Sequence, residues 1–426
     1  MRFNTLDEWL VWQESLNPRE IELGLDRVAR VLHQAGHTDE FDCPLITVAG
    51  TNGKGSIVAY LEAIALAQGC RTCSYTSPHL LRYNERIRIN GEAISDQSLC
   101  EAFERIDQAR AGADLTYFEF GTLAAIDLFR AANPDLVIME VGLGGRLDAV
   151  NIMNPGVAVI TTIAIDHIDW LGSDRETIGY EKAGIMRAGR PAVCGDYDPP
   201  QSLLEHAEQT GAELKLIGKH FDAKREGELW HFYAEGDGMD ALPLPALSGE
   251  FQLTNAATAI MALKSLTGFD LADGSVQRGL RDAHLPGRFQ KIQHRPEVIV
   301  DVAHNVQAAA SLTAQLRADN DCTGRTYAVV AMLADKQVTD VIGQLSGVID
   351  HWYTAGLETV PRGLSAQDMA AAVERQASDV KLSAASTVAT ACEQALTAAG
   401  KNDRIIIFGS FYTVAEAMQF FASQIQ

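Results

Sequence analysis

A glycine-rich stretch, Ala49–Ser56, contains the residues of this sequence that could most directly do chemistry. It reads Ala-Gly-Thr-Asn-Gly-Lys-Gly-Ser, follows the apolar run Leu45–Val48 and precedes a helical pattern. Glycines let backbone N–H groups turn toward a phosphate, and the N-terminus of the following helix adds positive potential. Lys54 would then reach the terminal phosphates of a nucleotide, and the Ser56 hydroxyl would lie near a metal. The ordinary P-loop differs in having a further glycine at its start and no residue between lysine and serine.

Polar side chains also follow three other apolar runs. Glu140 ends the run 136–139, His167 follows the run 157–161, and Ser77 begins a Ser-Pro-His turn after a shorter run. In a doubly wound sheet, ligands bind beyond the carboxyl ends of the strands, so we expect these groups near the glycine-rich loop. A carboxylate there could hold Mg²⁺, and a neutral imidazole could be a further ligand. Taken singly, each could be an exposed or structural side chain, but their convergence favours a metal site.

The loop 141–151 is similar to a dinucleotide fingerprint but fails it, because Leu147 stands where the third glycine belongs. We therefore interpret Arg146 and Asp148 as substrate contacts rather than as parts of an NAD site. Lys182 lies in a predicted helix, where the simplest interpretation is a lysine exposed to solvent.

Length and composition describe an ordinary globular protein with two domains. The chain has 426 residues, of which 47% are hydrophobic and 21% charged, and a single core seldom extends over that length. The formal net charge of −21 argues against sequence-independent binding of DNA or RNA, which depends on basic patches. We therefore expect small-molecule substrates and no nucleic-acid partner.

The sequence favours a cytoplasmic protein without a membrane partner. Its N-terminal residues contain no apolar core of a signal peptide, and its apolar runs are too short to span a bilayer. The seven cysteines are an odd number without regular spacing, which fits a reducing compartment. Cys70 and Cys73 form a C-x-x-C without a second pair, so a zinc or redox role is disfavoured.

Short apolar runs alternate with helix-like segments along the whole chain, which is typical of parallel sheets covered by helices. We expect an α/β fold with a doubly wound, mostly parallel sheet, a small antiparallel insertion and then a smaller Rossmann-like α/β domain. The insertion is expected over 214–233, where the pattern alternates, and an extended connector over Leu242–Pro245. The predicted strands are 45–48, 71–75, 136–139, 157–161 and 191–194 in the first domain, and 298–301, 327–332, 351–354 and 405–408 in the second.

The boundary between the domains is placed near Leu285–Arg288, which gives domains over 1–287 and 288–426. Arg288 lies at this hinge, and Asp301 ends an apolar run of the second domain. An arginine that enters a phosphate site from another domain can stabilise a transferring phosphoryl group.

Taken together, these motifs closely resemble those of the bacterial folylpolyglutamate synthase/dihydrofolate synthase family, which belongs to the Mur-ligase-like, ATP-dependent amide ligases. The resemblance covers nearly the whole chain. Mur-like ligases in general share the glycine-rich loop, whereas the combination of the other motifs is specific to the folate branch. The supporting motifs are Gly50–Ser56, Ser77–Leu80, Leu115–Glu119, Glu140–Ala149, Asp166-His167, Glu181–Gly184, Leu285–Phe289 and Asp301–Asn305.

The resemblance implies a role for each motif. ATP would be bound by Gly50, Thr51, Asn52, Gly53, Lys54, Gly55, Ser56, Asn255, Arg288 and Asp301. Metal would be held by Ser77, Glu140, His167 and Lys182, the last as a carbamate formed with CO₂. The catalytic residues would be Lys54, Lys182, His304 and Arg288. The acceptor site would be lined by Glu22, Leu23, Gly24, Leu25, Thr116, Tyr117, Phe118, Glu119, Leu147, Asp148 and Ala149.

The activity that the resemblance implies is ATP-dependent ligation of L-glutamate to dihydropteroate and to reduced folates through an acyl phosphate. It implies two Mg²⁺ ions, room for a monovalent cation, and a monomer whose first domain binds ATP and the pterin substrate. The second domain would lie on the glutamate side and close over ATP. Two other classes stay open: a Mur-type cell-wall ligase, which usually has an extra N-terminal domain, and a P-loop kinase or NTPase, which needs no amino acid. The failed fingerprint disfavours a dehydrogenase.

Overall fold

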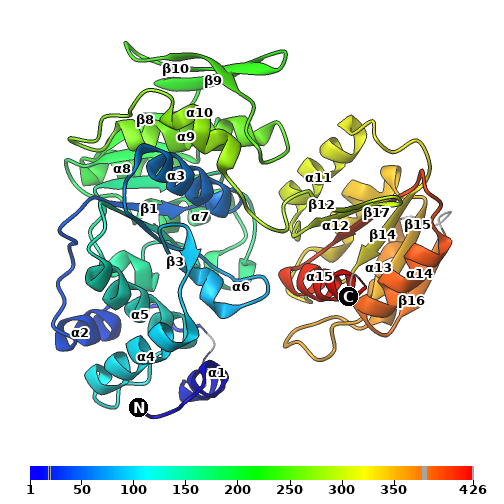
Figure 1. Ribbon diagram of the computed structural model, residues 1–426, viewed down its shortest axis with the longest axis horizontal. Helices are drawn as coiled ribbons and strands as arrows, with labels where there is room; N and C mark the ends of the chain where they lie inside the picture. The colour runs from blue at the N-terminus through cyan, green and yellow to red at the C-terminus, as the bar shows by residue number, and fades with distance from the viewer. Residues whose placement is uncertain (18, 20, 377–380, 425–426) are drawn as a thin grey trace. The chain divides into compact units, whose positions relative to one another are not determined.

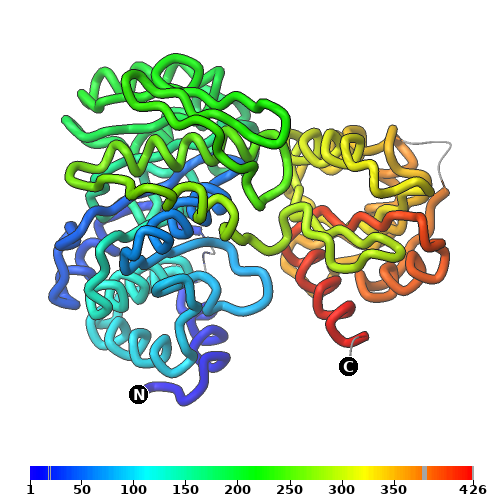
Figure 2. The backbone as a smooth tube through the Cα atoms, turned by 45° about the horizontal axis from the view of Figure 1, so that its top comes forward, coloured from blue at the N-terminus to red at the C-terminus, as the bar shows by residue number. Residues whose placement is uncertain are grey.

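The computed structural model describes residues 1–17, 19, 21–376 and 381–424, and the chain divides into two compact units. Unit 1 consists of Met1–Ala246 and Glu250–His284, and unit 2 of Leu247–Gly249 and Leu285–Gln426. Each unit has a parallel sheet of its own with helices packed against it (Figure 1). The path of the backbone through each unit can be followed in Figure 2.

The large sheet of unit 1 is mostly parallel. Its strands are β1 (Leu45–Ala49), β2 (Thr72–Tyr75), β3 (Ile87–Ile89), β4 (Glu92–Ala93), β5 (Leu136–Glu140), β6 (Val157–Ile160), β7 (Pro191–Cys194) and β8 (Glu213–Leu216). They lie in the order β4-β3-β2-β5-β1-β6-β7-β8. Six neighbouring strands, β2, β5, β1, β6, β7 and β8, are parallel to one another. Strands β3 and β4 extend the sheet beyond β2 in antiparallel pairing. The predicted doubly wound sheet is confirmed.

The central strands are buried on both faces, as their apolar sequences predict. Every residue of β1 and of β5 is buried. Strand β1 lies between β5 and β6, with Val48 opposite Glu140 on one side and Val159 on the other. Because parallel strands of one sheet end at the same edge, the segments that follow β1, β2, β5 and β6 lie along one edge.

Helices cover both faces of this sheet. They are α1 (Leu6–Leu16), α2 (Asp26–Gln34), α3 (Lys54–Gln68), α4 (Asp96–Arg110), α5 (Tyr117–Ala132), α6 (Ile168–Leu171), α7 (Arg175–Ala183), α8 (Gln201–Thr210), α9 (Phe251–Lys264) and α10 (Ser275–Asp282), with short 3₁₀ turns η1 (Tyr83–Arg86) and η2 (Ala149–Ile152). Helix α3 contacts α9 and α10 (Figure 1). Helices α1, α2, α4 and α5 pack together around buried aromatic rings, among them Trp9, Phe103 and Phe120. These rings share a core with Leu45 and Ala49 of β1, so helices α1, α2, α4 and α5 cover one face.

The antiparallel insertion begins later than predicted. Leu214 belongs to β8, which pairs in parallel with β7 at the edge of the large sheet. An edge strand is partly exposed, so its sequence alternates as an antiparallel strand does. The small sheet consists of β9 (Phe221–Glu226), β10 (Leu229–Ala234) and β11 (Met239–Pro243). The predicted connector over 242–245 is wrong for Leu242 and Pro243, which end β11; proline is tolerated at the edge of a sheet.

Unit 2 has the smaller α/β fold that the sequence predicts. Its strands are β12 (Gln290–His294), β13 (Glu297–Asp301), β14 (Thr326–Val330), β15 (His351–Ala355), β16 (Lys381–Ala385) and β17 (Arg404–Phe408), in the order β12-β13-β17-β14-β15-β16. Only β12 is antiparallel to its neighbour. Its helices are α11 (Val306–Ala318), α12 (Val338–Leu345), α13 (Ala366–Gln376), α14 (Val388–Ala398) and α15 (Phe411–Ser423), with the 3₁₀ turn η3 (Ser346–Val348). The edge strands β12 and β16 were not predicted, because both are partly exposed and polar.

Two further findings concern the length of the helices and the state of the cysteines. Within the ranges that the structure describes, no helix combines the length and the apolar sequence that a membrane span requires. All seven cysteines are free thiols. Burial raises the pKa of Cys73 to about 12, which makes it a poor nucleophile and metal ligand.

Candidate active site

The glycine-rich loop joins β1 to α3, and its backbone requires two of its glycines. Gly50 has a φ of +146° and Gly53 a φ of +92°, which L side chains rarely adopt. A Cβ on Gly50 would overlap the hydroxyl of Thr161, and one on Gly53 would lie 2.7 Å from Asn255 Oδ1. Helix α3 begins directly behind the loop at Lys54. At these two positions the backbone of the loop lies so close to Thr161 and Asn255 that only glycine fits.

The segment that follows β6 holds this loop in place. The Thr51 N–H donates to Thr162 O at 2.8 Å, and the Thr51 hydroxyl donates to Ala164 O at 3.0 Å. The Thr161 hydroxyl donates to Asn52 O at 2.6 Å. These bonds order the loop before a ligand arrives, which lowers the entropic cost of binding.

Two lysine side chains converge on the loop. Lys54 Nζ donates to Gly50 O at 3.1 Å and to Thr51 O at 3.2 Å, and Lys182 Nζ donates to Gly50 O at 2.9 Å. Lys182 is only 3% exposed, so its interpretation as a solvent-exposed lysine is wrong. Burial, together with the charge of Lys54, lowers the pKa of Lys182 to about 7.

Glycines allow α7 to bring Lys182 this close. A Cβ on Gly145 would lie 2.8 Å from the carbonyl oxygen of Glu181, and one on Gly184 would overlap Arg146. Arg146 also pairs with the Glu181 carboxylate at 2.8 Å. The loop after β5 and helix α7 thus pack with their backbones nearly in contact, which the helical pattern around Lys182 does not reveal.

A buried amide links two residues that were predicted to contact ATP. Gln252, in the first turn of α9, is 1% exposed. Its Nε2 donates to Ser56 Oγ at 3.2 Å, and its Oε1 accepts from Asn255 Nδ2 at 3.1 Å and from the Tyr60 hydroxyl at 3.2 Å. The sequence analysis missed Gln252. The available signal was a polar residue three positions before Asn255 in an otherwise apolar helix.

The predicted metal ligands Ser77, Glu140 and His167 lie along the edge of the sheet that carries the glycine-rich loop. Glu140 ends β5, is 4% exposed and accepts from the Ser77 N–H at 3.2 Å. His167 follows β6 with a φ of +52°, and its N–H donates to Asp166 Oδ1 at 2.8 Å. Carboxylate and hydroxyl oxygens with an imidazole nitrogen match the donors that a divalent cation takes in proteins.

The three segments predicted to line the acceptor site come together in unit 1. They are Glu22–Leu25, Thr116–Glu119 and Leu147–Ala149. The Gly24 N–H donates to Leu147 O at 3.4 Å, which joins the first segment to the third. Arg27 Nη1 donates to Glu22 at 2.7 Å and its Nη2 to Glu119 at 2.7 Å, which joins the first segment to the second. Arg27 was not among the predicted site residues.

The second segment contributes two half-buried aromatic side chains, of which Phe118 packs beside the loop after β5. A Cβ on Gly142 would lie 2.6 Å from Phe118 Cζ, so the Phe118 ring rests on the Gly142 backbone. The Tyr117 ring meets the Tyr83 ring edge to face, with centroids 5.4 Å apart. Partly exposed aromatic faces of this kind suit a planar heterocyclic ligand.

The carboxylate of Asp148 is buried within the third segment. It accepts from the N–H groups of Leu143 and Val150, both at 2.9 Å. Burial raises the pKa of Asp148 to about 6, since these two bonds only partly offset the loss of solvent. Its neighbour Ala149 is buried as well, whereas Leu147 is half-buried.

Unit 2 carries the other predicted site residues, Arg288, Asp301 and His304. Asp301 ends β13 and is buried, and its carboxylate accepts from the N–H groups of Phe289 and Ala303 at 2.8 Å each. Burial raises the pKa of Asp301.

The side chains of Arg288 and His304 flank one aromatic ring. The Arg288 guanidinium lies 5.2 Å from the centre of the Phe411 ring, and the His304 ring lies 6.2 Å from it. His304 Nδ1 lies 2.8 Å from Val302 O, so Nδ1 carries the proton. In the neutral ring, Nε2 is then the acceptor.

Two Mur ligase families match the chain. The Mur ligase middle domain matches residues 48–263, and the Mur ligase glutamate ligase domain matches residues 287–411. The dihydrofolate synthase/folylpolyglutamate synthase of Escherichia coli K12 is 41% identical over 97% of this chain and 95% of its own length. The chain belongs to the dihydrofolate synthase/folylpolyglutamate synthase family of Mur ligases. The resemblance seen in the motifs is thus confirmed.

Solved structures of this family agree with the fold. E. coli FolC in complex with DHPP and ADP superimposes with a TM-score of 0.93 at 40% identity, covering 99% of both chains. A bifunctional folylpolyglutamate synthase/dihydrofolate synthase with Mn, AMPPNP and L-glutamate bound has a TM-score of 0.90 at 43% identity, covering 99% of this chain and 98% of its own. These relatives bind nucleotides, and the second also holds a divalent metal and an amino acid.

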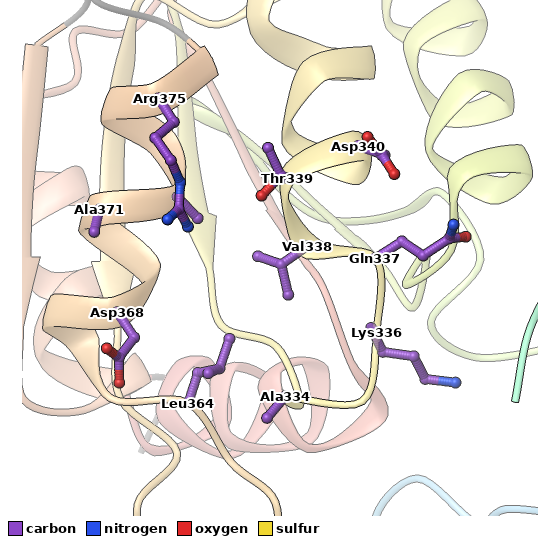
Figure 3. Close-up of a pocket in the computed structure, with 11 residues that line it drawn as sticks. Ala334, Lys336, Gln337, Val338, Thr339, Asp340, Leu364, Asp368, Ala371 and Arg375 are labelled. Carbon is purple, nitrogen blue, oxygen red and sulfur yellow. The ribbon is translucent and has the colours of Figure 1, made fainter. Parts of the chain in front are cut away.

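Unit 2 of this chain also has an open pocket, here called the hollow, of about 480 Å³ (Figure 3). Ala371 and Arg375 of α13 lie on one side of it, and Val338 and Thr339 of α12 on the other (Figure 3). None of the predicted site residues is among the described residues that line it. The hollow is therefore separate from Arg288, Asp301 and His304.

Proposed function

We propose that this chain uses ATP to join L-glutamate to 7,8-dihydropteroate, and further glutamate to reduced folates. The observation that carries the proposal is the position of the loop after β5. The loop packs against the helix that carries Lys182, and its Leu147 carbonyl accepts from Gly24 of the acceptor segments. It thus connects the helix of Lys182, whose amino group donates to Gly50 O, with a segment that we assign to the acceptor. Relatives that match nearly the whole chain are named for both activities, which supports the same reaction here.

The proposed reaction activates a carboxylate, because oxide is too poor a leaving group for direct attack by an amine. An oxygen of the acceptor carboxylate attacks the γ-phosphorus of ATP, which forms an acyl phosphate and releases ADP. The amino group of L-glutamate then attacks the acyl carbon and loses a proton as phosphate departs. No side chain forms a covalent bond in either step, so the chain positions reactants and offsets charge. Lys54 and the N–H groups of Gly53–Ser56 are assigned to the phosphates.

Ser77, Glu140 and His167 are proposed to hold Mg²⁺. Glu140 fits this role because its carboxylate is buried at the end of β5 and a carboxylate oxygen is a ligand that a hard cation prefers. A bound divalent cation would supply positive charge against the phosphate oxygens. Relatives with Mn and AMPPNP bound support the use of a divalent metal.

Lys182 is proposed to carry a carbamate. Its nitrogen would bond to the carbon of CO₂ and lose a proton, so that an ammonium becomes an anionic oxygen ligand. The support is geometric: Lys182 is buried and shares the Gly50 carbonyl with Lys54, another cation. A carbamate at this position would replace repulsion between two cations by attraction.

Arg288, Asp301 and His304 of unit 2 are assigned to ATP and its phosphates, and unit 2 as a whole to the glutamate side. The match of residues 287–411 to a glutamate ligase domain supports this division. The monovalent cation, the monomeric state and the cytoplasmic location stay predictions.

ADP release from the purified protein tests the proposal. The assay contains ATP, Mg²⁺ and L-glutamate with dihydropteroate, with tetrahydrofolate or with neither. We expect ADP with each acceptor, and only when glutamate is present. Activity with tetrahydrofolate alone would restrict the chain to polyglutamate synthesis. ADP release that needs neither acceptor nor glutamate would instead favour a P-loop NTPase.

A further inference from the structure

Arg27 binds two carboxylates that come from different parts of unit 1. It lies in the first turn of α2, and its Nη1 donates to Glu22 Oε2 at 2.7 Å. Its Nη2 donates to Glu119 Oε1 at 2.7 Å and to Oε2 at 2.9 Å, with a longer bond from Nε to Oε2 at 3.3 Å. One planar guanidinium thus spans the first and second acceptor segments.

Glu119 is the more buried of the two carboxylates that Arg27 binds. Its side chain is 4% exposed, and Arg27 is the cation paired with it. The other donor to its carboxylate is the Thr116 N–H at 2.7 Å, in the capping box that begins α5. Removing one partner of a buried ion pair is strongly destabilising, because the other charge is left without compensation. Arg27 therefore fixes Glu119 and, through it, the start of α5.

Glu22, the second carboxylate that Arg27 binds, also has several hydrogen-bond donors. Besides Arg27, its carboxylate accepts from Asn17 Nδ2 at 3.0 Å and from Arg19 Nη1 at 3.1 Å. Helix α2 begins after Leu25 without a side-chain cap. The ion pairs of Arg27 therefore tie the first turn of α2 to the acceptor segments, in addition to the packing of Val28 in the core. The hydrogen bond from the Gly24 N–H to Leu147 O joins the same segment to the third segment.

From this geometry we propose that Arg27 is a positioning residue of the acceptor site, which sets the spacing between the Glu22–Leu25 and Thr116–Glu119 segments. The inference rests on the proposed function, since it deepens the acceptor site assigned there. Arg27 acts through Glu22 and Glu119 rather than on the reacting atoms. Acceptor binding depends on it, whereas binding of ATP and of glutamate does not.

Steady-state kinetics of Arg27→Gln and Arg27→Lys test this inference. We expect Arg27→Gln to raise the KM for dihydropteroate about tenfold or more, because small displacements of binding groups have effects of that size. The KM for ATP and the kcat at saturating acceptor should stay within about twofold of the wild type, because the nucleotide groups are not displaced. Arg27→Lys should be intermediate, since lysine keeps the charge but cannot bind two carboxylates in a fork.

The matched control is Arg30→Gln, which removes the same charge from an exposed position one turn further along α2. Equilibrium binding of dihydropteroate, followed by its fluorescence, should weaken by the same factor as the KM rises. Thermal melting of each variant reports folding, and Arg27→Gln/Glu119→Gln restores charge balance if Arg27→Gln alone does not fold.

Several outcomes would overturn the inference. If Arg27→Lys had the same acceptor KM as the wild type, binding of both carboxylates by one guanidinium would not matter for the acceptor site. Equal rises in all three substrate KM values, or rises no larger than in Arg30→Gln, would reduce Arg27 to a general structural role. A wild-type protein that makes no ADP with any acceptor would instead contradict the proposed function, so the two failures are distinguishable.

Discussion

The amino groups of Lys54 and Lys182 donate to the same acceptor, the carbonyl oxygen of Gly50, at 3.1 and 2.9 Å. Lys54 begins α3 and Lys182 lies in the last turn of α7, so two helices distant in sequence direct their lysines to one residue of the glycine-rich loop. Two ammonium groups that share one carbonyl repel each other in a buried environment. An anionic ligand at the loop would offset this repulsion.

Replacement of Lys54 by alanine should abolish ATP-dependent turnover without unfolding the protein. Loss of a charged group aimed at the transferring phosphate is expected to lower kcat by about 10²–10³-fold. ADP release measures the effect, and circular dichroism checks the fold. Lys219→Ala, at an exposed position of the same unit, is the control and should keep wild-type activity. Turnover retained in Lys54→Ala would remove Lys54 from the phosphate site.

Replacement of Lys182 by alanine should also abolish activity, but short carboxylic acids should partly restore it. Acetate or propionate could occupy the space of the missing side chain and supply the carboxylate that a carbamate would otherwise provide. The control is Lys54→Ala, which the same acids should not rescue. Native mass spectrometry of the wild type in bicarbonate should show one added CO₂. A bare lysine in the complex with Mg²⁺ and ATP would contradict the carbamate.

Replacement of Glu140 by glutamine should raise the Mg²⁺ concentration required for half-maximal activity. The amide keeps the shape of the side chain but removes the negative charge at the end of β5, and a neutral oxygen binds a hard cation more weakly. A Mg²⁺ titration of ADP release measures this, with EDTA-treated wild type as the reference. Glu92→Gln, an exposed glutamate of β4, is the matched control. Identical titration curves for Glu140→Gln and the wild type would place the ion elsewhere.

Replacement of Gly50 by alanine should destabilise unit 1 by about 1–3 kcal/mol, because a strained backbone conformation carries a penalty of that order. The φ of +146° disfavours any L side chain, and the new methyl would overlap Thr161. Gly211→Ala is the control, since its φ is also positive at +73° but nothing lies within 4 Å. Urea unfolding compares the two variants. Equal losses of stability would show that the backbone angle, and not the contact with Thr161, dominates.

The sequence predicted those parts of the site whose signals are local. The strand before the glycine-rich loop is an apolar run, and the loop is defined by its own glycines. Arg27 was not found in this way, because its partner Glu119 lies 92 positions away. Gln252 is a polar residue in an apolar helix, but this local signal does not identify its partner Ser56, which lies 196 positions away.

Burial was predicted poorly where it depends on another segment. The helical pattern around Lys182 contains charged residues on several sides, and only the backbone contact at Gly145 shows which side is covered. The edge strand β8 was assigned to the insertion for a related reason, since partial exposure gives a parallel edge strand an alternating sequence. Local patterns therefore identify elements more readily than they identify neighbours.

The small sheet of unit 1 should be more stable at about pH 6 than at about pH 8, because of His231. Its Nδ1 lies 2.9 Å from Asp240 and its Nε2 lies 3.1 Å from Glu226, while Lys224 is its cross-strand partner. The hydrogen bond to Asp240, followed by smaller contributions from its charge and from Glu226, raises the pKa of His231 above its ordinary value. A raised pKa in the folded state adds stability that is complete at low pH and is lost as the pH rises through that pKa.

NMR titration of His231 measures this shift directly, and Glu226→Gln should lower the pKa by removing one of the two carboxylates. Glu228→Gln, an exposed neighbour in the same hairpin, should leave it unchanged. Amide hydrogen exchange in β10 should speed up between about pH 6 and about pH 8 by more in the wild type than in Glu226→Gln, after correction for intrinsic rates. If the corrected rates in the two proteins depend equally on pH, His231 does not stabilise the sheet through its charge.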